Sequence, residues 1–464
     1  MLILKWGKIY WLIGELFLAA KSTPAMKRFC IFVPMKQLAT LLLLLPALLP
    51  AQTYVSYFTG DTSDVNTPAS GGVALMGGAT ENDNAMRWFL QRANGGDVVV
   101  IRASGSDGYN DYLYSELGVA VNSVESIVTA SLAAANDPYV AQQIRRAEAL
   151  WIAGGDQGKY VSFWKDGPVG DALRYLIEEK KAVIGGTSAG MAILGSAYFS
   201  ALNGSISSAE ALANPFNAKM TLGNGDFLQV PYLENLVTDT HYDNPDRRGR
   251  QVAFIARLST DTGQRFRGIA SEEYSAVCID TAGIGRVFGN FPQSQDFVYF
   301  LQPACETPFL PETCVPNAAL DWNLGQKALR VCKVPAMNDG STSFSVKDWK
   351  TTVSGAWESW WVEQGQLKTQ AAAGPPNCVS TTQEGQGSHF QVFPNPSPAS
   401  FCVEMDAYQT AGNAQLLNAQ GEWLQNIDLV SGKNNLDLRA FRAGIYFLKI
   451  NVGAGGQVVK LCRI

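Results

Sequence analysis

The sequence contains very little histidine and no cysteine pair of the kind that binds metal. Its 464 residues include only two histidines, His241 and His389, and no Cys-x-x-C motif. Zinc sites in proteins are built mainly from cysteine and histidine side chains, so this scarcity argues against such a site. We therefore expect no metal ion.

The sequence also lacks an excess of basic residues. Lysine and arginine number 36 against 41 aspartates and glutamates, which gives a net charge of -5. Nucleic-acid binding usually requires a basic surface that neutralises phosphates, so we expect no nucleic-acid partner. The hydrophobic content of 47% is that of a globular chain with one large domain or two smaller ones.

Long apolar runs are confined to the N-terminus. A short basic start at residues 35–37 precedes LATLLLLLPALLPAQ, which offers a small residue, Ala51, for cleavage. This pattern predicts a secretory signal peptide, because the run is too short and too interrupted by proline to span a membrane stably. Charges interrupt another apolar stretch in residues 1–34, so we expect the true start at Met26 or Met35. An N-terminal anchor helix is the alternative.

Seven of the eight cysteines follow this leader. An exported chain permits disulfides among them. Cys305 and Cys314 flank the proline-rich loop ETPFLPET, and this pair is our first expectation for a bridge.

After the leader, short apolar runs alternate with amphipathic stretches of helix length. The runs are GGVALMGGA, DVVVIRAS, ESIVTASL, ALWIAGGD and KAVIGGTS. Continuous apolar strands with helices between them predict an α/β fold, with a mostly parallel sheet and helices on both faces. In such sheets ligands bind beyond the carboxyl ends of the strands.

The pattern changes beyond residue 300. We expect a leader at residues 1–51, an α/β domain at 52–365 and a Gly/Pro/Ser/Thr/Gln-rich linker at 366–388. Residues 389–464 alternate apolar and polar side chains around glycine and asparagine turns. They predict a small all-β, sandwich-like module.

One stretch carries a motif for nucleophilic chemistry. Residues 186–190, GTSAG, match G-x-S-x-G, in which a sharp turn presents the serine hydroxyl above a sheet. The hydroxyl of Ser188 needs a base to accept its proton. His241 lies within the α/β region, whereas His389 lies in a polar segment, so His241 is the expected base.

A third group should orient the imidazole. Asp239 and the pair Glu272 and Glu273 are candidates, and spacing does not choose between them; each could instead be a solvated surface charge. The GGDQ loop at residues 154–157 could supply backbone N–H groups to an oxyanion hole together with Ala189. The alternative for this loop is a plain strand-to-helix turn.

Taken in order, these features resemble the cyanophycinase and peptidase E family of serine peptidases over residues 71–345. The markers are the Gly-Gly-Ala turn at 77–79, GGDQ at 154–157, GGTSAG at 185–190, DTHY at 239–242, and the basic stretch at 247–250 followed by GIASEEYSAV. The resemblance implies a fold like that of class I glutamine amidotransferases, no cofactor and a homodimer.

The resemblance also implies roles for individual residues. It makes Ser188 the nucleophile, His241 the general base and acid, and Glu273 the orienting carboxylate. The residues expected in the oxyanion hole are Gly155, Asp156 and Ala189. Those expected to bind substrate are Asp156, Gln157, Asp239 and Thr240.

The implied reaction is hydrolysis of a peptide or isopeptide bond beside an aspartyl residue. Cyanophycinases cut a β-aspartyl-arginine polymer and peptidase E cuts aspartyl dipeptides. Thr240 replaces the family's glutamine and Met191 stands where alanine is common, which leaves the peptide open. The alternatives are an inactive surface binding protein and an α/β-hydrolase-type esterase that uses His389.

The C-terminal module resembles the type A sorting domain of type IX secretion substrates in Bacteroidetes. The similarity lies in FPNP at Phe393–Pro396 and GIYFLKI at Gly444–Ile450. It implies export through the periplasm, contact with the type IX machinery, and a protein that is secreted or attached to the cell surface. A carbohydrate-binding or adhesive β module is the alternative.

Overall fold

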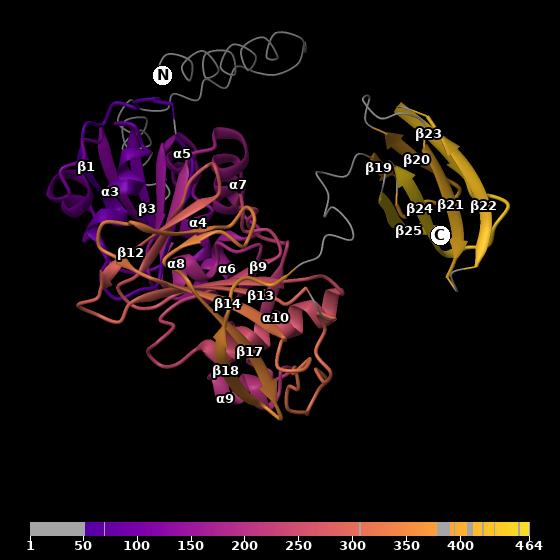
Figure 1. Cartoon of the computed structure of the whole chain (residues 1–464). Coiled ribbons are helices and arrows are strands. Elements are labelled where there is room, and N and C mark those ends of the chain that lie inside the picture. Colours follow the sequence, from indigo (N-terminus) through magenta and orange to yellow (C-terminus); the bar gives the residue numbers. More distant parts are fainter. Residues whose placement is uncertain are drawn as a thin grey trace, which may run out of the picture. The chain divides into compact units, whose positions relative to one another are not determined.

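A computed structural model describes most of the chain after the leader (Figure 1). The described residues are 52–68, 70–305, 308–377, 390–393, 395–405, 412–419, 422–430, 432–452 and 455–463. The predicted leader at 1–51, with the start residues Met26 and Met35, lies outside them, as does His389. In the described part, no helix combines the length and the hydropathy needed to cross a membrane.

The first sheet has ten strands in the order β1-β4-β3-β5-β6-β2-β11-β12-β15-β16. Their bounds are β1 Val55–Gly60, β2 Val73–Met76, β3 Asp97–Arg102, β4 Ser123–Val128, β5 Ala149–Ile152, β6 Val183–Thr187, β11 Ala276–Ile279, β12 Ile284–Phe291, β15 Thr342–Ser345 and β16 Thr352–Val353. The five neighbours β4, β3, β5, β6 and β2 run parallel. The other pairs are antiparallel.

The expectation of a mostly parallel sheet is therefore wrong for the sheet as a whole. The parallel core matches the apolar runs seen in the sequence, because strands covered on both faces are continuously apolar. The strands added after residue 275 follow one another without intervening helices. Short connections join the antiparallel neighbours β11 and β12, and β15 and β16, whereas a long segment of the chain separates β12 from β15.

Helices cover both faces of the first sheet, as expected. They are α3 Asp83–Gln91, η2 Tyr112–Glu116, α4 Leu132–Ala135, α5 Pro138–Arg146, α6 Gln157–Trp164, α7 Pro168–Tyr175, η3 Leu176–Lys180 and α8 Ala189–Ala192. On β3, Val99 and Ile101 belong to an apolar cluster with residues of α5, α6 and α7. Val98 and Val100 belong to another cluster with residues of α3. Alternate side chains of a strand point to opposite faces, so the two clusters lie on the two sides of the sheet.

The second sheet has eight strands in the order β18-β17-β14-β13-β10-β9-β7-β8. Their bounds are β7 Ala197–Phe199, β8 Leu222–Asn224, β9 Leu236–Asp239, β10 Arg267–Ser271, β13 Phe297–Pro303, β14 Leu329–Pro335, β17 Ala356–Glu363 and β18 Gln366–Ala372. Helices α9 (Ser208–Ala213) and α10 (Arg248–Thr262) share an apolar cluster with this sheet. Only β7, β9 and β10 run parallel to one another.

The linker expected at residues 366–388 begins later than predicted. Residues 366–372 form β18, which pairs with β17 along its whole length. The prediction failed here because β18 is an edge strand whose side chains are mostly exposed and polar, so it lacks the apolar alternation that marks a strand.

The C-terminal module forms two small sheets, of three and four strands, as expected of an all-β unit (Figure 1). Its strands are β19 Phe390–Phe393, β20 Ser400–Met405, β21 Gly412–Asn418, β22 Trp423–Leu429, β23 Gly432–Asp437, β24 Gly444–Val452 and β25 Gly455–Arg463. Phe401, Leu416 and Leu448, from three of these strands, are fully buried in one apolar cluster. The module therefore has a hydrophobic core of its own.

The expected Cys305–Cys314 bridge is wrong. Cys305 is disulfide-bonded, but Cys314 is a free thiol. Cys314 is buried in the apolar cluster of the second sheet, together with Leu320 and Trp322. Proximity in sequence across a proline-rich loop did not bring the two side chains together.

Candidate active site

Ser188 lies at the turn between β6 and α8. Its backbone adopts φ 51° and ψ -118°, a conformation that costs a residue with a side chain about 1–3 kcal/mol. The turn is sharp because α8 approaches β5 closely, and a Cβ at Gly190 would collide with the carbonyl of Ile152. This geometry lifts the serine hydroxyl above the carboxyl end of β6.

The Ser188 hydroxyl is hydrogen-bonded to His241. Its Oγ lies 2.7 Å from Nε2 of the imidazole. The other ring nitrogen, Nδ1, lies 2.6 Å from Oε1 of Glu273. Ser188 follows a strand of the first sheet, whereas His241 and Glu273 follow β9 and β10 of the second sheet. The three side chains thus form a hydrogen-bonded chain of hydroxyl, imidazole and carboxylate, the Ser188 chain, in which an imidazole can accept the proton of a serine hydroxyl.

The backbone after β2 fixes the position of the imidazole. The carbonyl of Gly77 accepts a hydrogen bond from the His241 N–H at 2.9 Å. Gly78 has φ +123°, and a Cβ there would collide with the imidazole ring. The Gly-Gly-Ala turn at residues 77–79 therefore packs directly against the ring.

Glu273 is held in its charged form by its neighbours. The hydrogen bond with His241 is the largest effect and lowers the pKa of the Glu273 carboxyl, and partial burial opposes it. Asn244 Nδ2 contributes a further, longer contact of 3.5 Å to Oε2. An ionised Glu273 can stabilise the imidazolium that forms when His241 takes the serine proton.

The GGDQ loop follows β5, the neighbour of β6. A Cβ on Gly154 would lie 3.5 Å from the Cβ of Ser188, so the loop borders the serine. Asp156 caps α6 by accepting hydrogen bonds from Gly158 N at 2.9 Å and Lys159 N at 3.4 Å. Ala189 is the first residue of α8, and such a residue has an N–H without an intrahelical acceptor.

Two residues expected to bind substrate are buried. Asp239 is 2% exposed and both of its carboxylate oxygens bond Arg250. Thr240 is 4% exposed and its carbonyl accepts from Arg247 at 3.0 Å. Asp239 also lies outside the Ser188 chain, so the structure brings together Ser188, His241 and Glu273 and leaves Asp239 apart. This placement does not fit a direct substrate contact for Asp239.

Gln157 and Gly155 remain accessible. Gln157 is half-buried at the start of α6, and Gly155 is exposed. Sequence reasoning missed the two arginines that bind Asp239 and the carbonyl of Thr240. The available signal was the basic run at residues 247–250 directly after the histidine, which the structure places at the start of α10.

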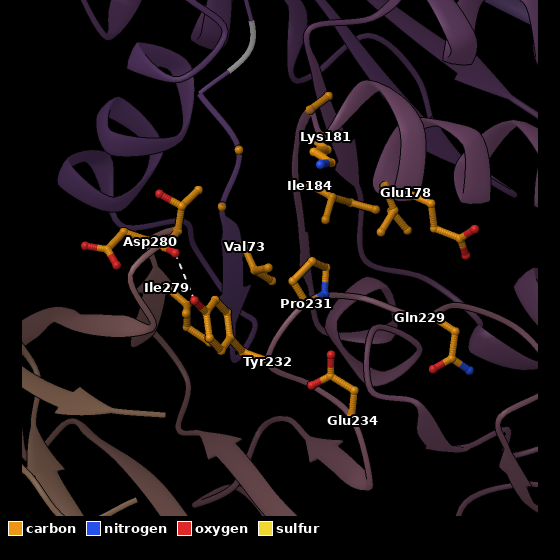
Figure 2. A pocket seen from close by; sticks show the side chains of 15 residues that line it. Val73, Glu178, Lys181, Ile184, Gln229, Pro231, Tyr232, Glu234, Ile279 and Asp280 are labelled. Carbon is orange, nitrogen blue, oxygen red and sulfur yellow. Dashed lines mark hydrogen bonds between the residues drawn. The ribbon is translucent and has the colours of Figure 1, made fainter. Parts of the chain in front are cut away.

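A cavity of about 580 Å³ lies apart from Ser188, beside the start of β2 (Figure 2). Figure 2 shows its apolar wall, formed by Val73, Ile184, Pro231 and Ile279, with Tyr232 beside them. Val73 begins β2, whereas Ser188 hydrogen-bonds the carbonyl of Met76 at the other end of that strand. None of the three residues of the Ser188 chain lines this cavity.

Comparison with known proteins identifies the C-terminal module. Residues 391–462 match the secretion system C-terminal sorting domain. This match confirms the predicted type IX secretion signal. The protein is therefore secreted or attached to the cell surface, as expected.

The α/β region is similar to two cyanophycinases, one from Synechococcus elongatus and one from Thermosynechococcus vestitus. Each is 25% identical over 236 residues, which cover 49% of this chain and 68% of the relative. Among solved structures, a peptidase from an acI-B1 Actinobacterium is 13% identical, with a TM-score of 0.37, 50% of this chain covered and 91% of the other. A putative peptidase E protein from Listeria monocytogenes is 14% identical, with a TM-score of 0.29 and coverages of 48% and 98%.

Proposed function

Since the chain is cyanophycinase-like over its α/β region and ends in a type IX sorting domain, we propose that it is an exported serine peptidase. It hydrolyses a peptide or isopeptide bond next to an aspartyl residue. The observation that carries the proposal is the continuous hydrogen-bonded chain from Ser188 through His241 to Glu273, with distances of 2.7 and 2.6 Å.

The reaction is acyl transfer. Ser188 Oγ attacks the carbonyl carbon while Nε2 of His241 accepts its proton, and Nδ1–H of the ring donates to Glu273. The N–H groups of Gly155 and Ala189 stabilise the oxyanion, a contribution of about 3 kcal/mol for one donor. His241 then protonates the leaving amine, and water activated by the same imidazole hydrolyses the acyl-enzyme.

The preference for an aspartyl residue is supported by charge near the site. Arg247 donates from Nη1 to the carbonyl of Thr240 at 3.0 Å, and its charge interacts with Glu273. Its Nε is buried and finds no partner among the described residues. The arginine as a whole is only half-buried, so its positive charge beside the Ser188 chain favours an acidic group on the substrate.

The esterase alternative would require His389 as the base. In the described structure the Ser188 hydroxyl already has His241 as its partner at 2.7 Å, so the observed contact favours the peptidase. The chain order Ser, His, Glu also differs from the α/β-hydrolase order of Ser, acid, His.

Ser188→Ala tests the mechanism. The mature protein is incubated with cyanophycin, Asp-X peptides and isoAsp-X peptides, and the products are identified by mass. Ser188→Ala should abolish hydrolysis, because among the described residues only the Ser188 hydroxyl has this contact with His241. The control is Ser115→Ala, an exposed serine on η2, which should retain full activity. Hydrolysis that persists in Ser188→Ala would refute the proposal.

Fluorophosphonate labelling separates the peptidase from the inactive binding protein. An activated serine reacts with this probe whatever its natural substrate, because the reaction needs only the nucleophile and its base. We expect stoichiometric labelling at Ser188. An unlabelled, correctly folded protein would favour a binding protein on the same scaffold.

A further inference from the structure

A second buried glutamate stands directly before Glu273. Glu272 is 7% exposed and its carboxylate makes two hydrogen bonds. Oε2 accepts from the backbone N–H of Phe297 at 2.7 Å, and Oε1 accepts from the hydroxyl of Tyr299 at 2.9 Å. Neither contact belongs to the Ser188 chain, although the two glutamates are consecutive.

The carboxylate of Glu272 replaces a main-chain acceptor at the end of β10. Strands β10 and β13 pair antiparallel as far as Ser271 and Val298. At the next position Glu272 N donates to the Phe297 carbonyl at 3.2 Å. In a regular ladder the Phe297 N–H would donate back to the Glu272 carbonyl. Here it donates to the Glu272 side chain instead.

Because the side chain takes the place of the carbonyl in the ladder, the Glu272 carbonyl can accept hydrogen bonds within a turn. The carbonyl accepts from the backbone N–H of Ser275 at 3.2 Å and from its hydroxyl at 2.8 Å. The turn at residues 272–275 leaves the sheet at once and carries Glu273 to His241. Without a side-chain acceptor, the half-buried Phe297 N–H would lose its hydrogen-bond partner, which is costly.

The turn and the imidazole share one support. Gly77 donates its N–H to the Ser275 carbonyl at 2.9 Å and accepts from the His241 N–H at 2.9 Å. A displacement of the turn therefore changes the position of Glu273 relative to His241. A shift of about 1 Å in such a contact can cost a factor of about 100 in rate.

We propose that Glu272 is a positioning residue whose ionised carboxylate holds the 272–275 turn and thereby aligns Glu273 with His241. The inference deepens the proposed peptidase function and rests on it. Glu272 does not touch substrate. It acts through the turn, and its ionisation makes the activity of the serine depend on pH.

The environment of Glu272 places its ionisation near neutrality. Burial raises the pKa of its carboxyl to about 7, against the hydrogen bonds from Tyr299 and Phe297, which lower it. Among the charged groups around it, Asp243 raises this pKa and Lys333 of β14 lowers it.

Other charged residues influence Glu272 indirectly, through Tyr299, whose hydroxyl donates a hydrogen bond to it. Arg248 of α10 and Glu358 of β17 both influence the Tyr299 hydroxyl. A protonated Glu272 offers fewer acceptor sites to its two donors than the carboxylate does. The turn should therefore loosen as the pH falls through about 7.

The test is the pH dependence of Ser188 phosphonylation by a fluorophosphonate, measured on the full chain from about pH 5 to about pH 9. This readout does not require the natural substrate. In the wild type, the labelling rate should show a step near pH 7, falling about tenfold as Glu272 takes up a proton and the turn loosens.

Glu272→Gln should lower the rate at alkaline pH by about tenfold and remove the step near pH 7, because the amide does not ionise. The amide keeps the length of the side chain but has one acceptor oxygen in place of two, so its NH2 group would face one of the two donors. Circular dichroism and urea unfolding verify that the variant is folded.

Tyr299→Phe gives the second, distinguishing result. It removes the hydroxyl that lowers the pKa of Glu272, so the Glu272 ionisation should move to higher pH. At alkaline pH the carboxylate is restored and the rate should return to within about twofold of the wild type. A purely structural loss would lower the rate equally at every pH.

Glu125→Gln is the matched control. Glu125 is also a buried carboxyl, 3% exposed, whose pKa is raised by burial and which accepts from a tyrosine, Tyr139, at 2.7 Å. It lies on β4, which pairs with the edge strand β1. Its replacement should affect stability and leave the labelling profile unchanged.

The outcomes separate the two claims. Wild-type profiles in both Glu272→Gln and Tyr299→Phe would overturn the role of Glu272 and leave the proposed peptidase intact. If Glu272→Gln does not fold, a wild-type pH profile of labelling in Tyr299→Phe is by itself enough to overturn the role of Glu272. A wild-type protein that is not labelled at Ser188 overturns the peptidase function and this inference with it.

Discussion

At the scale of single residues, the site depends on backbone positions that place side chains accurately. Ser188 and His241 both have positive φ values, 51° and 46°, although neither is glycine. Each such residue costs stability and persists only when its surroundings require it. Here the surroundings are the close approach of α8 to β5 and the packing of the residue 77–79 turn against the imidazole.

Gly78→Ala tests the contact with the imidazole. The added Cβ would collide with the His241 ring, so Ser188 labelling should fall by about a factor of 100. The control is Gly95→Ala, because Gly95 also has a positive φ, +77°, but nothing within 4 Å of the added Cβ. This variant carries the backbone strain without the collision, and its labelling rate should match that of the wild type. Equal losses in both variants would attribute the effect to strain.

The sequence pointed to Ser188 and His241 by motif and by the scarcity of histidine. Residue spacing did not choose among Asp239, Glu272 and Glu273, because all three are carboxylates near the ends of apolar strands; the family resemblance implied Glu273. In the structure these three have distinct partners: Arg250, Tyr299 and His241. Partners from distant parts of the chain cannot be inferred from local spacing.

At the scale of helices and strands, α10 is anchored to β9 by a buried ion pair. Arg250 of α10 bonds both oxygens of Asp239 at the end of β9, and the two side chains are 4% and 3% exposed. His241 lies two residues after Asp239 in the sequence. The pair therefore supports the segment that carries the proposed base.

Arg250→Ala should destabilise the protein strongly. Removing one partner leaves the Asp239 charge buried and unpaired, with an expected loss of about 3–5 kcal/mol in the free energy of unfolding. Urea unfolding measures this loss. Arg248→Ala is the control, because Arg248 pairs with Asp246 at the surface, with side chains 42% and 53% exposed. Its effect should stay below about 1 kcal/mol, and a similar loss in both variants would argue against the buried pair.

The sequence predicted the strands that are continuously apolar, and it failed for strands at or near the edges of the two sheets. The parallel core from β4 to β2 matches the apolar runs. Composition places strand β18 in a linker, because its sequence QLKTQAA lacks the apolar alternation of a strand. In the structure most of its side chains are exposed. The antiparallel strands β11, β12, β15 and β16 gave no signal of their sheet membership, since the pairs β2–β11 and β12–β15 join residues far apart in sequence.

At the scale of the whole molecule, the chain combines an α/β region with a sorting module that has its own core. A chain ending at residue 377 lacks the segment that matches the sorting domain. It should be retained inside the producing cell, because the export signal is missing, while Ser188 labelling in lysates continues. Immunoblots of cells and medium measure the distribution. Full-length Ser188→Ala is the control and should be exported normally; export of the truncated chain would contradict the role of the module.

The sequence by itself determined the chemistry available to this protein: a serine in a tight turn, one histidine in the α/β region, a C-terminal export signal and no cysteine or histidine cluster for metal. These features are local or compositional, so they can be read along the chain. Residue spacing left open which carboxylate contacts His241, and the tertiary structure places Glu273 there and leaves Cys314 a free thiol. It also assigned Glu272 to the Phe297 N–H and the Tyr299 hydroxyl. Such choices depend on contacts between two sheets, and only folding brings their partners within hydrogen-bond distance.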